Sequence, residues 1–273
     1  MITKRFALLA MAAGLAGLVA GCGHQIQTTS GSDYLAAYKA VDGRAGPAAA
    51  TDAEIIAAAD VEPQLRFPAR LGLARLDKGG LSPVPAAEAE AWRDLAERLG
   101  SGYGEFVPVS PLIAALATPA PLQPDFRDDG WRRYRKSLAQ VVQEVRLGAA
   151  RQHLDAVLIY EPFGTSSEAS NPLAITKLAL IGFFLPTEGV EAEGFAQAVL
   201  VDVRNGYTYG TASAVSEKPS YRLTTVSDSG DAHRTARGEA QARAVAALTG
   251  EVETMLRDLR LALAERRLET GGP

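Results

Sequence analysis

The order of its segments predicts a three-layer α/β fold for this chain of 273 residues. Strand-like and helix-like periodicities alternate in the first half of the folded region, and an Asn-Gly hairpin signal follows them. The last long segment carries an uninterrupted helical pattern. A strand–helix–strand–helix–strand order implies two right-handed parallel crossovers. We therefore expect a mixed sheet with two parallel crossovers, followed by an antiparallel hairpin and a long C-terminal helix.

The first five segments are defined by their flanking residues as well as by their periodicity. "LRFPARLGLARL" alternates and precedes a Gly-Gly turn, whereas "PAAEAEAWRDLAERLG" is a helix that Gly100 terminates. "EFVPVSPLI" contains prolines that cannot donate to a sheet, which predicts an edge strand. After a helix over about 131–153, "LDAVLIYE" is almost continuously apolar, as in a central strand covered on both faces. We expect Val157, Leu158 and Ile159 to be buried there.

The hairpin "FAQAVLVDVRNGYTYGTASAV" has Asn205-Gly206 at its turn, which predicts that Val203 pairs with Thr208. This register gives one face of small and branched residues, on which a helix can lie closely. The opposite face, either a solvated surface or a recognition site, would carry Asp202, Arg204, Tyr207 and Tyr209. The two tyrosines are candidates for contact with a partner.

Residues 231–268 predict a long helix whose apolar positions step by three and four. A typical strand covers only about 17–20 Å, far less than the length of such a helix. The second half of the helix would then bend near Gly250, pack on other helices of the chain or meet a second chain. Packing within the chain is the favoured alternative, and an oligomer formed through this helix is the other. The apolar seam consists of Val245, Leu248, Val252, Met255, Leu259 and Ala262.

An apolar segment at residues 175–186 allows two interpretations. As an inner strand it would be hidden from solvent. As an exposed patch it would mark a binding or membrane-contact surface, because monomers rarely leave large contiguous apolar areas uncovered. We favour an inner strand whose end, formed by Phe183, Phe184 and Leu185, projects toward a partner protein.

The chain begins with a short positive segment and an uncharged apolar run, residues 6–21, that ends in small residues before Cys22. The run is shorter than the roughly 20 residues that a bilayer-spanning helix needs, and it is typical of a secretory signal. Cys22 is the only cysteine of the chain. The pattern resembles the bacterial lipobox, which implies that residues 1–21 are a signal peptide and that Cys22 is acylated. The alternatives are an ordinary signal peptide and an uncleaved anchor.

The residue after the cysteine is Gly23. Similarity to the sorting rules of enterobacterial lipoproteins, in which Asp at this position favours the inner membrane, implies attachment to the outer membrane, facing the periplasm. Residues 22–63 are polar and then rich in Ala and Gly, which predicts a flexible tether with a short helix. We expect a single α/β domain over 64–268 and a frayed tail over 269–273.

Composition and motifs argue against several classes of function. A formal net charge of −4 disfavours nucleic-acid binding, which needs a clustered basic face. The sequence holds no HExxH, CxxC, Walker A or GxSxG motif. Asp228, Asp231 and His233 lie close enough in sequence to ligate a divalent metal, but capping of the last helix by Asp231 is the favoured interpretation. We expect no catalytic residue and no cofactor.

The order "RLGLARL", "FVPVSPLI", "DAVLIYE", "GFFLP" and "LVDVRNGYTYGTASA" resembles the rhombotarget-type lipoproteins. More distantly, it is similar to the amino-terminal α/β domain of the Tol–Pal propeller protein and to the curli-secretion lipoprotein. The resemblance implies a lipid-anchored outer-membrane protein that acts without catalysis in assembly, secretion or complex formation. The chain lacks the paired long amphipathic hairpins of a secretion channel. The alternatives are a periplasmic module that binds a small ligand or a metal and, more remotely, a hydrolase.

Overall fold

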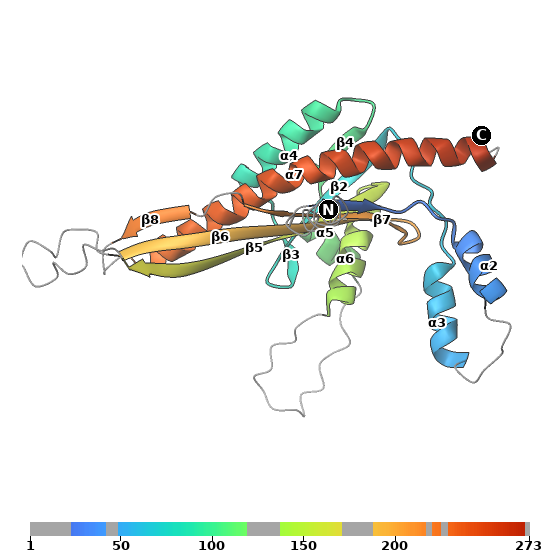
Figure 1. Cartoon of the computed structure of the whole chain (residues 1–273), viewed down its shortest axis with the longest axis horizontal. Coiled ribbons are helices and arrows are strands. Elements are labelled where there is room, and N and C mark those ends of the chain that lie inside the picture. Colours follow the sequence, from blue (N-terminus) through green and yellow to red (C-terminus); the bar gives the residue numbers. More distant parts are fainter. Residues whose placement is uncertain are drawn as a thin grey trace, which may run out of the picture.

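The computed structural model describes residues 23–41, 49–118, 137–170, 188–216, 220–224 and 229–270 (Figure 1). Its strands are β1 (Gly23–Ile26), β2 (Ala69–Asp77), β3 (Gly80–Ser82), β4 (Gly104–Pro108), β5 (Ala156–Ser170), β6 (Glu188–Asp202), β7 (Thr208–Val215) and β8 (Ser220–Thr224). Its helices are α2 (Gly31–Val41), α3 (Ala49–Ala59), α4 (Ala86–Leu99), α5 (Pro111–Ala117), α6 (Leu138–Arg151) and α7 (Ser229–Thr270).

The eight strands form one mixed sheet in the order β1-β7-β6-β5-β2-β3. Strand β2 pairs in parallel with both β4 and β5, while the β5–β6 and β6–β7 pairs are antiparallel. Helices α4 and α7 lie on one face of the sheet, and α5 and α6 lie on the other (Figure 1). The predicted mixed three-layer fold with two parallel crossovers, a hairpin and a long C-terminal helix is therefore confirmed.

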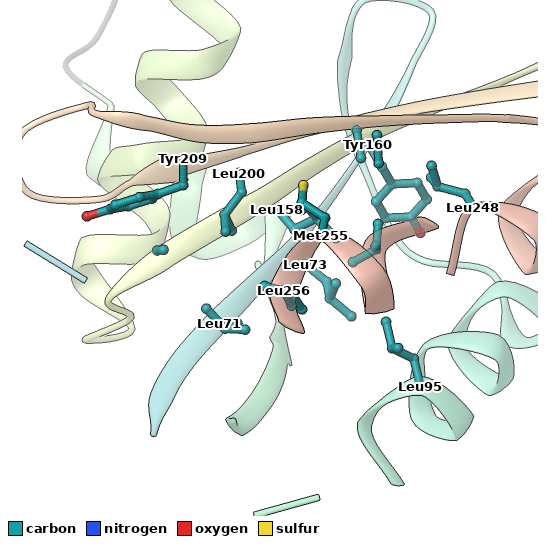
Figure 2. Packing of buried hydrophobic residues seen from close by; sticks show 14 of the residues in the cluster. Leu71, Leu73, Leu95, Leu158, Tyr160, Leu200, Tyr209, Leu248, Met255 and Leu256 are labelled. Carbon is teal, nitrogen blue, oxygen red and sulfur yellow. The ribbon is translucent and has the colours of Figure 1, made fainter. Parts of the chain in front are cut away.

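Strand β5 is the centre of the sheet, between β2 and β6, as its apolar sequence predicts. Val157, Leu158 and Ile159 are 0%, 1% and 4% exposed. Alternate side chains point to opposite faces, so Leu158 joins the cluster under α4 and α7 (Figure 2), whereas Val157 joins the cluster under α6. Among the described residues β4 pairs with β2 alone, so the proline-containing strand lies at an edge as expected.

Helix α7 packs along the β5–β6 pair over most of its length because β5 and β6 are far longer than expected. Each of the two strands has 15 residues, or about 50 Å, and the 42 residues of α7 span about 63 Å. The argument that the helix cannot bury its seam against this sheet is therefore wrong, and α7 passes Gly250 as one continuous element. The expected packing within the chain is confirmed. Of its predicted seam, Val245, Leu248, Val252, Met255 and Leu259 are fully buried, whereas Ala262 is only partly buried and Leu263 is the buried residue of that turn.

The first half of α7 approaches the sheet through residues with little or no side chain. A Cβ atom at Gly194 of β6 would stand 2.1 Å from the carbonyl oxygen of Ala240, closer than any real contact. Ala192, Ala236 and Ala240 form the small buried cluster beside it. The helix backbone therefore lies directly on the β5–β6 ribbon, where larger side chains would not fit.

The hairpin register differs from the predicted one. Val201, not Val203, pairs with Thr208, and a bulge lies between Leu200 and Val201. The turn includes more residues than Asn205 and Gly206. Oδ1 of Asp202 accepts hydrogen bonds from the backbone N–H groups of Arg204, at 2.8 Å, and of Asn205, at 3.4 Å, and these bonds stabilise the longer turn. The face under α7 consequently carries Ala196, Ala198, Leu200, Tyr207, Tyr209, Ala212 and Ala214, and the valines pack toward α6.

The segment expected to be a flexible tether contributes a strand to the sheet. Gly23 to Ile26 form β1, which pairs antiparallel with β7 from Ser213 to Gly210. The His24 ring fixes this strand to α7, with its nitrogens 3.5 Å from Glu251 and 3.0 Å from Asp258. The tether prediction is thus wrong at this point, although the expected short helix is present as α3. The expected frayed tail is still helical at residues 269 and 270.

The described helices include none that is both long and apolar enough to cross a membrane.

The position of β5 gives a direct stability test. Leu158→Ala should lower the free energy of unfolding by about 2–5 kcal/mol, because it leaves a cavity in the central strand. Leu261→Ala, on the outer face of α7 where Leu261 is 64% exposed, should change it by less than about 0.5 kcal/mol. Urea denaturation of both variants measures the two values. Equal effects would contradict the central position of β5.

Candidate interaction sites

The hairpin residues expected at a solvated or partner-binding face are mostly buried. Tyr207 and Tyr209 are 3% and 0% exposed, and Asp202 is 0% exposed. The Tyr209 hydroxyl donates to Oδ2 of Asp202 at 2.7 Å and accepts the backbone N–H groups of Gln64 and Leu65 at 2.9 and 2.7 Å. Burial, and then the Asp202 carboxylate, raise the pKa of Tyr209. The two tyrosines are therefore not partner contacts, and that prediction is wrong.

These hairpin side chains instead fasten the segment between β1 and β2 to the body. The Tyr207 hydroxyl donates to the carbonyl oxygen of Thr29 at 2.8 Å, and Asn205 Nδ2 donates to that of Glu62 at 2.7 Å. With the bonds of Tyr209 to Gln64 and Leu65, the segment is held at both of its ends. The bulge and wide turn that the sequence did not reveal are what direct these side chains inward.

The Glu62 carboxylate makes a second connection at the same place. It accepts hydrogen bonds from the hydroxyls of Ser30 and Ser32 at 2.7 and 2.9 Å, and Arg266 of α7 lies 3.2 Å away. Burial raises the pKa of Glu62, but these hydrogen bonds outweigh it and hold that pKa below its usual value. The carboxylate thus joins the start of α2 to the last turns of α7.

A buried ion pair connects α4 to the sheet. Arg75 Nε donates to both carboxylate oxygens of Glu88, at 3.1 and 2.9 Å, and the Tyr160 hydroxyl donates to Glu88 Oε2 at 2.9 Å. Burial, followed by the charge of Glu88, raises the pKa of Tyr160. Since Arg75 and Glu88 are both nearly inaccessible, the pair connects two layers of the fold and does not present a charged group to solvent.

Two of the three candidate metal residues, Asp231 and His233, lie within the described residues. Asp231 lies in the first turn of α7 and pairs with Arg234, and His233 is part of the same helix. Asp228 lies outside the described residues. The part of the chain that the structure describes holds no group of three or more His, Cys, Asp or Glu residues able to ligate a metal ion.

A groove of about 640 Å³ lies on the face of the sheet that carries α6. Both apolar and polar residues line it. Glu161, one of the lining residues, has a raised pKa, chiefly because of burial and then because of the charge of Asp77. Gly23, the first residue after the cysteine, is part of the lining. The apolar residues that line the groove from the α6 face include Leu76, Leu138, Val142, Ile159 and Val199.

Beyond the groove, β5 and β6 continue as a paired ribbon to Ser170 and Glu188. On the face away from α7, Phe163 stacks on Phe195 with ring centroids 6.1 Å apart, and Phe163 remains 41% exposed. Residues 171–187, which connect the two ends of this ribbon, lie outside the described residues, and they include the predicted contacts Phe183, Phe184 and Leu185. Cys22 also lies outside the described residues.

Comparisons with known proteins do not assign this chain to a family. No family model matches the chain, and no curated protein matches it. Among solved structures it is similar to a dodecamer of a single-substitution variant of PelC from Paraburkholderia phytofirmans, with 12% identity, a TM-score of 0.27, and coverage of 68% of this chain and 87% of that one. A likeness of this size supports no inference about fold, assembly or function.

The Tyr209 hydroxyl can be tested by removing it alone. Tyr209→Phe should lower the free energy of unfolding by about 1–3 kcal/mol, because the buried Asp202 and two backbone N–H groups lose their partner. Limited proteolysis between β1 and β2 should also become faster. Tyr34→Phe, in which the exposed ring of α2 changes in the same way, is the control. If both variants behave as the wild type does, the hydroxyl does not hold this segment.

Proposed function

We propose that the chain is a lipid-anchored protein of the bacterial outer membrane, facing the periplasm, that acts without catalysis as a component of an envelope complex. Acylated Cys22 is its membrane attachment. Its partner is another envelope protein, which it meets through the end of the β5–β6 ribbon.

The observation that carries this proposal is the strand that begins directly after the only cysteine. Gly23 is paired with Ser213 in the sheet, so the residue proposed to carry the lipid directly precedes the folded body. A flexible tether of about 40 residues would instead let the body range over roughly 35 Å. A folded domain that starts at the anchor is held at the membrane surface, with β1 and α7 fixing its orientation there. This geometry suits a protein that must present one surface repeatedly to a neighbour in the same envelope.

The use of the buried polar groups supports a role without catalysis. Asp202 and Tyr209 hold the hairpin turn and the connection before β2, and Glu88 is shared between Arg75 and Tyr160. Each of these carboxylates already accepts hydrogen bonds from fixed partners. A general acid or base must instead reach a substrate proton at about 2.6–3.2 Å.

The long ribbon supports the partner contact. Helix α7 covers only one face of it, and the other face carries the stacked pair Phe163 and Phe195. The segment that joins the two strands contains the apolar stretch 175–186. The two strand ends that this segment joins, Ser170 and Glu188, are paired at the far end of a ribbon of about 50 Å, away from the α4–β2 part of the core.

The anchor can be tested by two substitutions at adjacent residues. Cys22→Ala should leave an uncleaved precursor that accepts no fatty-acid analogue. Gly23→Asp should keep the label but, by similarity to enterobacterial sorting, move the protein to the inner membrane. A Cβ at Gly23 meets nothing within 4 Å, so the fold should not change, and Gly23→Ala is the matched control. Metabolic labelling and density fractionation of membranes provide the readouts. Wild-type protein that takes no label would refute the lipid anchor.

The partner contact can be tested with a photocrosslinking residue. Placed at position 184, it should give an adduct of one defined mass in intact cells. Placed at Leu261, which is exposed on α7, it should not give that adduct. Phe184→Asp should weaken the same complex while the circular dichroism spectrum and unfolding midpoint stay unchanged. If Phe184→Asp unfolds the protein, Phe184 belongs to the core and the partner surface lies elsewhere.

A further inference from the structure

A hollow of about 630 Å³ lies where four parts of the chain meet. They are the connection before β2, the start of β5, the β6–β7 turn and the last turns of α7. The volume is within the range of roughly 300–1,000 Å³ that is typical of small-molecule sites. One carboxylate, that of Asp155, lines it. Four arginines line it too, and we call it the arginine hollow after them: Arg66, Arg204, Arg266 and Arg267.

Two of the four guanidinium groups are held by acidic partners. Arg204 donates to Oδ1 of Asp155 at 2.5 Å. Arg266 donates to Oε2 of Glu62 at 3.2 Å and to the carbonyl oxygen of Thr28. These contacts fix the two side chains at the wall of the hollow and neutralise their charges.

The other two guanidinium groups have no such partner. Among the described residues, no hydrogen bond or ion pair engages the side chains of Arg66 or Arg267, and the one carboxylate that lines the hollow, that of Asp155, already pairs with Arg204. Four arginines and one carboxylate thus line the hollow, and the arginines still outnumber the carboxylates when Glu62 and the buried Asp202 are counted with them, in a chain whose formal net charge is −4. Local charge of this sign is what an anionic ligand requires.

A structural explanation accounts for only part of this excess. Arginine in the last turn of a helix interacts favourably with the exposed carbonyl groups there, which carry about −0.5 of an elementary charge. Arg267 is in that position in α7, but Arg66 belongs to the connection before β2. Half a unit of negative charge cannot balance two guanidinium groups.

We propose that the arginine hollow binds an oxyanion, a phosphate or a carboxylate group, with Arg66 and Arg267 as direct ligands. A planar guanidinium presents parallel N–H donors that match two oxygens of such a group. Arg204 and Arg266 bound the site, and the side chains of Pro63 and Leu263 supply apolar contacts for the uncharged part of the ligand. The oxyanion belongs either to a free small molecule or to an anionic lipid headgroup. The site does not depend on the lipid anchor.

Calorimetry on the full-length protein in non-ionic detergent tests the site, with inorganic phosphate and citrate as probes at constant ionic strength. The wild type should bind at least one probe saturably. Arg66→Gln and Arg267→Gln should each weaken binding by about tenfold or more, since each loses a charge-assisted hydrogen-bond pair. Arg93→Gln removes the same charge from an exposed position on α4 and should bind as the wild type does. The Lys variants at 66 and 267 should bind with intermediate affinity.

Sedimentation with phosphatidylglycerol or phosphatidylcholine vesicles distinguishes the two sources of the oxyanion. Binding of the free probes assigns a small-molecule ligand. Preference for phosphatidylglycerol that the Arg66→Gln/Arg267→Gln variant loses, without binding of the free probes, assigns a lipid headgroup. The proposal is overturned if the wild type binds none of the three anions, or if a folded double variant binds them as the wild type does. The circular dichroism spectrum of each variant verifies folding.

Discussion

The close contact between α7 and the long β5–β6 pair is the constraint on which the rest of the structure depends. Gly194 leaves room for the carbonyl of Ala240, and a row of alanines continues the contact toward the middle of the sheet. Further along, the same helix buries larger side chains, including Met255 and Leu256, against the centre of the sheet (Figure 2). One helix thereby covers strands that are distant in sequence. Removing this contact would expose apolar surface along the whole sheet.

The same contact makes the two faces of the sheet unequal. Helices α4 and α7 cover one face, and α7 follows it out along the ribbon, whereas α5 and α6 cover only the region around β2 and β5 (Figure 1). The described part of the second face therefore includes the groove beside β1 and the exposed Phe163. Coverage, and not the composition of the strands alone, decides which apolar residues remain available for contact.

At the end of the sheet that holds the hairpin turn, some polar groups are buried and stabilise the turn, and others line the arginine hollow. The inward-facing Asp202 and Tyr209 are satisfied by one another and by backbone groups, so they make the turn rigid. The arginines that line the hollow at this end come from separate segments, and two of them have no acidic partner among the described residues. A rigid turn of this kind keeps Arg204 at a fixed distance from the end of α7.

The sequence alone determined the kinds and order of the elements, because periodicity and turn residues act locally. The apolar run around Leu158 identified the central strand, the prolines identified an edge strand, and the spacing of Val245 to Leu259 identified the face of α7 that is buried. Only the tertiary structure decided the hairpin register, the length of β5 and β6, and the strand at Gly23. These depend on hydrogen bonds between residues far apart in the chain: β1 is four residues long and has no local signal, and its partner is β7. The arginine hollow was equally invisible in the sequence, since Arg66, Arg204 and Arg267 meet only when the sheet and α7 have formed.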